Sequence, residues 1–105
     1  MVQYFTVNIS EGAKQDLENI FDYIFNNSKN FSIASNFVLK LNKALVKSLS
    51  FSPTKHPIYK NKIRKFIYPQ NTNYVAYFEI FDETKEVIIH IITDTKQYTR
   101  YMNLS

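Results

Sequence analysis

The sequence predicts an α+β domain in which a two-helix hairpin packs on a twisted, mainly antiparallel sheet of four strands, in the order β-α-α-β-β-β. Two successive stretches carry apolar residues at helical spacing, and three later stretches are rich in β-branched and aromatic residues. Helices with one apolar face need a sheet to cover, and these strands supply it. Because 105 residues suit one core, we expect a single domain over residues 1–105.

The first strand and the first helix follow from spacing and from one capping residue. Residues 2–9 alternate in polarity and place Phe5, Val7 and Ile9 on one face of a strand. Ser10 is a typical N-cap, so a helix should begin directly after it. The apolar stripe of this helix steps by four, three and four residues and comprises Ala13, Leu17, Ile20 and Ile24.

A second helix is expected from an N-cap at Ser32 to about Ser50. Pro53 and Pro57 prevent its continuation. Since only a short loop separates the two helices, they should form an antiparallel hairpin. The apolar stripe of the second helix comprises Ala34, Phe37, Val38, Leu41, Leu45 and Leu49.

Three strands are expected in the second half of the chain, at residues 62–68, 74–81 and 86–93, with a turn at 82–85. Short connections favour an antiparallel meander. The first strand should then pair at one edge of this sheet, and the polar tail 94–105 should follow it.

Composition excludes several classes of protein and of site. The chain has no Cys, and its two His lack an acidic cluster nearby, so we expect no metal and no cofactor. No apolar run reaches the about 18 residues of a membrane span. The amino-terminal residues also lack the pattern of a signal peptide. We therefore expect a cytoplasmic protein that does not enter the membrane.

Positive charge is concentrated in the middle of the chain. Between Tyr23 and Phe78 there is no Asp or Glu, and all nine acidic residues lie outside this segment. A continuous basic surface speeds encounter with anionic partners. We therefore predict a cationic hollow that an anionic macromolecule fills. The nine basic residues of the segment are Lys29, Lys40, Lys43, Lys47, Lys55, Lys60, Lys62, Arg64 and Lys65.

Three quoted stretches, in this order, carry a resemblance that covers nearly the whole chain: VNISEGAKQDLENIFDYI, ALVKSLSFSP, and NYVAYFEI followed by VIIHIIT. The sequence resembles the RelE/ParE superfamily of toxins from type II toxin–antitoxin systems. The resemblance implies a small basic toxin that inhibits growth unless the carboxy-terminal segment of an antitoxin wraps around it in a hetero-oligomer. RelE-like members cut mRNA at the ribosome, whereas ParE-like members bind DNA gyrase and trap it on cleaved DNA.

The same resemblance indicates which residues would cleave RNA if this toxin were an enzyme. The candidates are Lys62, Arg64 and Lys65 on the second strand, with Lys96 and Tyr98 near the carboxy terminus. RelE-like toxins have an Arg on the third strand, and Tyr74 occupies that position here. Because Tyr cannot supply the charge of a guanidinium, we expect a ParE-like gyrase toxin. A ribosome-dependent mRNA endoribonuclease is the alternative, and a basic nucleic-acid-binding module is a further one.

Four aromatic residues are too many for a core of this size, and we expect them to line a groove for the antitoxin or the target. The five cations beside this groove favour an acidic antitoxin. His90 is expected to pack in its strand with a satisfied hydrogen bond, and His56 to be exposed in a loop. The candidate binding residues are Tyr59, Phe66, Tyr68 and Tyr74, with Lys40, Lys43, Lys47, Lys55 and Lys60.

Overall fold

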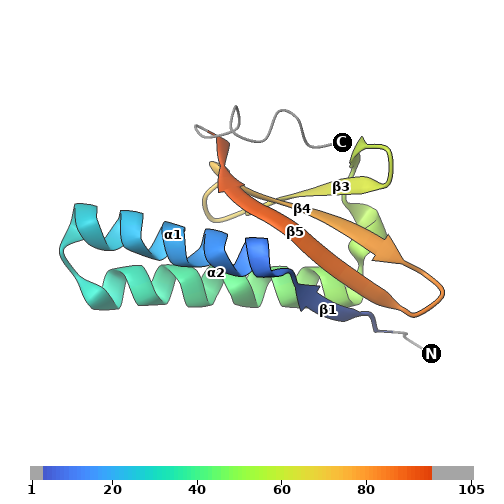
Figure 1. Cartoon of the computed structure of the whole chain (residues 1–105), viewed down its shortest axis with the longest axis horizontal. Helices are drawn as coiled ribbons and strands as arrows, with labels where there is room; N and C mark the ends of the chain where they lie inside the picture. Colours follow the sequence, from blue (N-terminus) through green and yellow to red (C-terminus); the bar gives the residue numbers. More distant parts are fainter. Residues whose placement is uncertain (1–3, 96–105) are drawn as a thin grey trace.

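The computed structural model describes residues 4–95, and it confirms the predicted α+β fold class. Two long antiparallel helices lie along one face of a twisted sheet (Figure 1). The elements are β1 (Thr6–Ile9), α1 (Glu11–Ser28), α2 (Phe31–Phe51), the 3-10 turn η1 (Pro53–Lys55), β2 (Ile58–Lys60), β3 (Ile63–Ile67), β4 (Tyr74–Phe81) and β5 (Glu86–Asp94).

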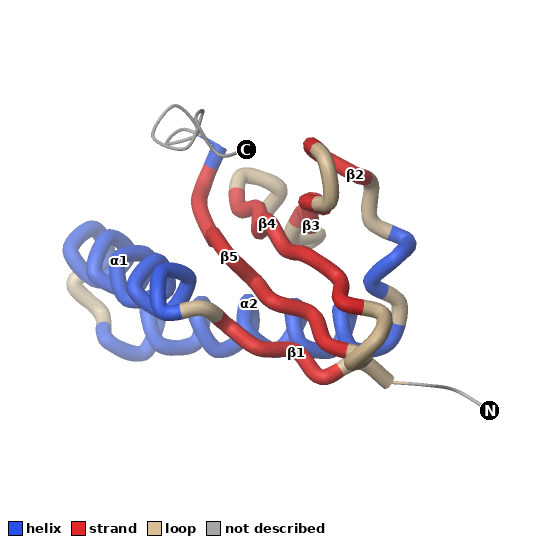
Figure 2. The backbone as a smooth tube through the Cα atoms, turned by 45° about the vertical axis from the view of Figure 1, so that its right-hand side comes forward, coloured by secondary structure: helices blue, strands red, loops and turns tan. Residues whose placement is uncertain are grey.

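Within residues 4–95 the sheet has five strands in the order β1-β5-β4-β3-β2, one more than the sequence predicted. Its meander from β3 to β5 is antiparallel and β1 lies at one edge, as expected. The pairing of β1 with β5 is parallel, which the sequence did not predict. The added strand β2 forms the other edge (Figure 2). It has three residues and pairs only with β3. So short a strand shows no alternation that sequence analysis could detect.

The start of α1 is the one predicted from Ser10. The Ser10 Oγ accepts a hydrogen bond from the Ala13 N–H at 3.1 Å. The same hydroxyl donates to the carbonyl of His90 at 3.2 Å. The capping residue therefore also ties the first turn of α1 to β5, which fixes how the hairpin lies on the sheet.

The start of α2 differs from the prediction, because Asn30 and not Ser32 is the N-cap. The Asn30 Oδ1 accepts a hydrogen bond from the Ile33 N–H at 3.1 Å, and its backbone is extended. Asn is as good a cap as Ser. Ser32 instead lies within the first turn of the helix.

We expect Asn30→Ala to destabilise the protein by about 1 kcal/mol, since it removes the only side-chain partner of the Ile33 N–H that the structure gives. The melting temperature, followed by circular dichroism, should fall by about 5 °C. Ser32→Ala is the matched control and should leave it nearly unchanged. Equal losses in both variants would contradict the assignment of the cap.

The predicted stripes of both helices meet the sheet in one core. Leu41, Leu45 and Leu49 of α2 are fully buried, as is Phe78 of β4. A smaller cluster lies on the opposite face of the sheet and comprises Ile63, Val75 and Tyr77, with Tyr59 and Ile91 packed against it. Within residues 4–95, no helix combines the length and apolar content that crossing a membrane requires.

The expected exposure of the four aromatic residues is wrong for three of them. Phe66, Tyr68 and Tyr74 are 2%, 3% and 7% exposed. The ring of Phe37 on α2 contacts Tyr68 and Tyr74, with centroids 6.0 and 4.9 Å apart. Tyr59 is half-buried and packs on Tyr77 at the other face. The sheet thus buries aromatic rings on both faces.

Candidate functional site

The basic residues of β3 separate onto two faces, because successive side chains of a strand point in opposite directions. Arg64 shares the helix-side face with Phe66, whereas Lys65 shares the other face with Ile63. The prediction of one hollow that collects the whole basic segment is therefore wrong. The basic side chains of this segment belong to several separate surfaces.

One of these surfaces is a depression of about 340 Å³ beside the turn between β2 and β3. Lys62 and Arg64 line it together with Asp82, which follows β4. The pairing of β3 with β4 brings this acidic residue back to the basic segment. Local charge is consequently mixed here, although the sequence places the two signs far apart.

Arg64 holds the chain that precedes β2. Its Nη1 donates hydrogen bonds to the backbone carbonyls of His56 at 2.7 Å and of Thr54 at 3.2 Å. Both carbonyls belong to the η1 region, so the guanidinium fixes that turn against β3. The first role that the structure gives to Arg64 is therefore structural.

His56 is half-buried, and the expectation that it is exposed is wrong. Its Nε2 lies 2.8 Å from the Ser48 Oγ on α2. The edges of Phe66 and Phe78 meet its ring at centroid distances of 5.2 and 5.9 Å. Burial lowers the pKa of His56, and the charges of Lys55 and Arg64 lower it further. Sequence analysis missed this contact, which depends on the turn between Pro53 and Pro57.

The lowered pKa of His56 predicts a stability that decreases in mild acid. Because the folded state protonates below the ordinary pKa of 6.5, the unfolded state takes up the proton first as the pH falls. The stabilisation is complete above that value and is lost as the pH falls toward the folded-state pKa. Between about pH 7.5 and about pH 5.5, the melting temperature of the wild type should fall further than that of His56→Gln. Equal decreases would contradict this assignment, since all other titrating groups are common to both proteins.

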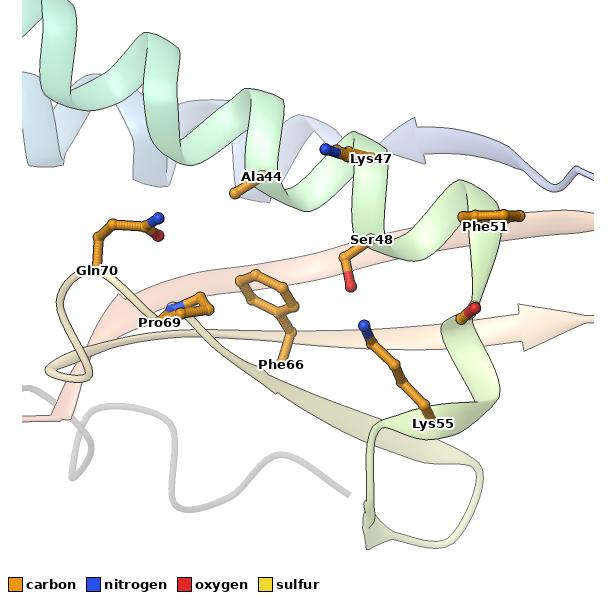
Figure 3. A pocket seen from close by; sticks show the side chains of 9 residues that line it. Ala44, Lys47, Ser48, Phe51, Lys55, Phe66, Pro69 and Gln70 are labelled. Carbon is orange, nitrogen blue, oxygen red and sulfur yellow. The ribbon is translucent and has the colours of Figure 1, made fainter.

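A pocket of about 280 Å³ lies between the carboxy-terminal part of α2 and β3 (Figure 3). Lys47 enters its lining from α2, and Lys55 enters it from η1. Phe66 and Pro69 are apolar members of the same lining. Lys40, Lys43 and Lys60, the other lysines of the predicted site, are exposed and outside this lining.

The face of the sheet opposite the helices carries the remaining candidates. Lys65 is half-buried there, near the packed rings of Tyr59 and Tyr77. His90 lies 3.2 Å from a carboxylate oxygen of Glu79, measured from its Nε2. The expectation that His90 packs with a satisfied hydrogen bond is confirmed. It sits where the register between β4 and β5 shifts, which turns its side chain toward Glu79.

Tyr74, at the position where the resemblance expects an arginine, points into the core. It is 7% exposed and packs on Phe37. Burial, with the nearby charge of Asp94 and the neighbouring Tyr23, raises the pKa of its phenol. A buried neutral phenol at this position cannot clamp a phosphate.

Two of the predicted catalytic residues, Lys96 and Tyr98, lie outside the described residues. Within residues 4–95, no group of three or more His, Cys, Asp or Glu side chains has the arrangement of a metal site.

The comparison with protein families decides the membership of the chain. The sequence model of one family, described as the ParE toxin of type II toxin–antitoxin systems, parDE, matches residues 7–98. The chain belongs to this ParE toxin family. It is therefore the toxin of a type II toxin–antitoxin system. None of the curated proteins compared with the toxin matches it in sequence.

Solved structures share the fold of the toxin. The chromosomal ParDE system from P. aeruginosa superposes with a TM-score of 0.70 at 19% identity, over 86% of this chain and 95% of that one. The RelBE2 complex from Mycobacterium tuberculosis gives 0.63 at 16% identity, over 90% and 94%. The intact E. coli RelBE complex gives 0.58 at 15% identity, over 87% and 96%. At such identities the likeness shows the fold alone, and ParE-like and RelE-like toxins both share it.

Proposed function

We propose that this toxin arrests growth by binding DNA gyrase and trapping it on cleaved DNA, and that an acidic antitoxin neutralises it. The family to which it belongs is the ParE toxin family. A gyrase poison acts as a binding partner, so it needs no set of catalytic side chains around an RNA phosphate.

The observation that carries the proposal is the environment of Tyr74. RNA cleavage needs cations that converge on the phosphate as charge develops in the transition state. At the third-strand position, where the RelE-like resemblance places a guanidinium, this toxin has a phenol that is 7% exposed. Arg64, which supplies the guanidinium of the described residues, already donates to two backbone carbonyls. Both features favour binding over RNA cleavage.

The proposal is tested by inducing the toxin in cells with and without the product of the neighbouring reading frame. We expect growth arrest only in its absence, accompanied by DNA damage and by transcripts that remain intact in primer extension. Codon-phased cuts in mRNA at the onset of arrest would overturn the gyrase proposal. Normal growth in both cultures would overturn toxicity itself.

One observation favours the second candidate, a ribosome-dependent mRNA endoribonuclease. His90 is paired with Glu79, and a carboxylate that orients an imidazole is a common arrangement for a general base. Lys65 lies on the same face of the sheet and could stabilise negative charge. If RNA cleavage occurs, it should be lost in His90→Ala and in Lys65→Ala. Cleavage that persists in both variants would exclude this set of residues.

The partner proposed here is a cognate antitoxin bound in a hetero-oligomer. The similar solved structures are those of toxin–antitoxin systems or complexes. The net charge of +4 and the acid-free middle segment favour an acidic partner. Because attraction between exposed charges is screened by salt, association should slow markedly as the ionic strength rises.

A further inference from the structure

The pocket between α2 and β3, which we call the Lys47–Lys55 pocket, is built from three separate parts of the chain. Lys47 and Ser48 come from α2, Lys55 comes from η1, and Phe66 comes from β3 (Figure 3). The hydrogen bond between Ser48 and His56 and the two bonds from Arg64 hold η1 in place. These contacts make the wall that carries Lys55 a fixed part of the fold.

The charge of this pocket is uncompensated. Of the residues that the structure describes, its lining contains two lysines and no acidic side chain. Among residues 4–95, the structure gives ion pairs only for Lys14 with Glu11 and for His90 with Glu79. The neighbouring His56 adds no positive charge at neutral pH, because burial and the nearby cations lower its pKa. A carboxylate that enters the pocket would meet ammonium groups for which the described residues give no ion pair.

The apolar part of the pocket indicates what accompanies the carboxylate. The lining also contains the apolar residues Ala44 and Pro69, of which Pro69 is exposed and Ala44 is half-buried. Phe66 is only 2% exposed, so it offers no ring face on which a nucleic-acid base could stack. The pocket therefore suits a peptide better than a single-stranded nucleic acid.

Two exposed aromatic rings lie on the surface beside the pocket. Phe51 lies at the rim and is 52% exposed. Its ring stacks on Tyr4, which is 65% exposed, at a centroid distance of 5.6 Å. Two such rings in contact with water are typical of a surface that a partner covers. An occupant that fills the pocket and crosses both rings must be a segment of chain several residues long.

We infer that the Lys47–Lys55 pocket receives an acidic segment of the antitoxin, with an apolar side chain on Ala44 and Pro69 and neighbouring carboxylates that pair with Lys47 and Lys55. The segment then continues over Phe51 and Tyr4. This inference rests on the proposed antitoxin partnership and adds the place and the chemistry of the contact.

The test uses the full toxin and fluorescein-labelled 15-residue peptides that tile the product of the neighbouring reading frame. Fluorescence anisotropy should detect one acidic, apolar peptide that binds the wild type. Lys47→Glu with Lys55→Glu should weaken its binding by about 100-fold, the loss typical of reversing a close charge pair. Lys40→Glu with Lys43→Glu, which makes the same charge change outside the pocket, should weaken it by less than about 5-fold. Replacing the acidic residues of the peptide with Lys should restore binding to the first variant.

Each other outcome overturns a defined part of the account. Equal losses of peptide affinity in the two double variants would mean that the attraction is diffuse, and would refute binding in the pocket. If the Lys47→Glu with Lys55→Glu variant still binds the peptide but no longer binds a 15-nucleotide single-stranded RNA, the two lysines bind nucleic acid instead. If the wild type binds neither the peptides nor the intact product, the proposed partnership fails. Lys47→Met with Lys55→Met, which keeps the aliphatic stems, separates loss of charge from loss of packing.

Discussion

Phe78→Ala should destabilise the toxin by about 3–5 kcal/mol, the cost of deleting a buried aromatic ring. Phe78 is fully buried in the main core, beneath α2. Its ring also meets the imidazole of His56, so the cavity would open toward the wall of the Lys47–Lys55 pocket. Small domains have only about 5–15 kcal/mol of stability in total. The variant should therefore be close to unfolding at physiological temperature and should fail to arrest growth.

Phe81→Ala is the matched control for this prediction. Phe81 ends the same strand but is 38% exposed. Its loss should cost less than about 1 kcal/mol. Urea unfolding followed by circular dichroism measures both values. If the two variants lose the same stability, the position of the core in this fold is wrong.

Arg64→Ala should destabilise the toxin by about 2 kcal/mol, because charge-assisted hydrogen bonds to two carbonyls are lost. The carbonyl of His56 would then have to find water in a half-buried site. The η1 turn should loosen, and Lys55 should no longer be held at the pocket. We expect weaker antitoxin binding and a lower urea midpoint in the same variant.

Lys65→Ala is the control that distinguishes the structural role of Arg64 from a role in binding the target. Lys65 is the next residue on β3 and carries the same charge, and the described residues offer it no ion pair. The urea midpoint of Lys65→Ala should differ little from that of the wild type, by about 0.5 kcal/mol at most. If Arg64→Ala keeps full stability while growth arrest is lost, Arg64 acts on the target and its contacts with the η1 carbonyls are incidental.

Local periodicity was enough to predict both helices and the meander. Leu41, Leu45 and Leu49 recur at the spacing of one helical face, and all three are buried. The capping residue Ser10 was also identified correctly, since its partner is only three residues away. Asn30 and Ser32 are both good caps, and their spacing alone could not decide between them.

Features that depend on contacts between distant residues could not be predicted in this way. The strand β2 exists because Ile58 pairs with Arg64, and the burial of His56 depends on the turn that returns it to Ser48. The pocket that Lys47 and Lys55 both line has the same origin. In contrast, the separation of Arg64 from Lys65 follows from the period of a strand and was available in the sequence. A count of charges along the chain does not show this separation.

The central claim, that this toxin acts by binding gyrase, is tested most directly with purified components. Gyrase, relaxed plasmid, ATP and the wild-type toxin are incubated together, with Phe78→Ala as the inactive control. The account predicts that supercoiling is inhibited and that cleaved DNA, covalently attached to gyrase, accumulates with increasing toxin. Undiminished supercoiling with no cleaved DNA, from a toxin preparation that cuts mRNA on ribosomes, would contradict it.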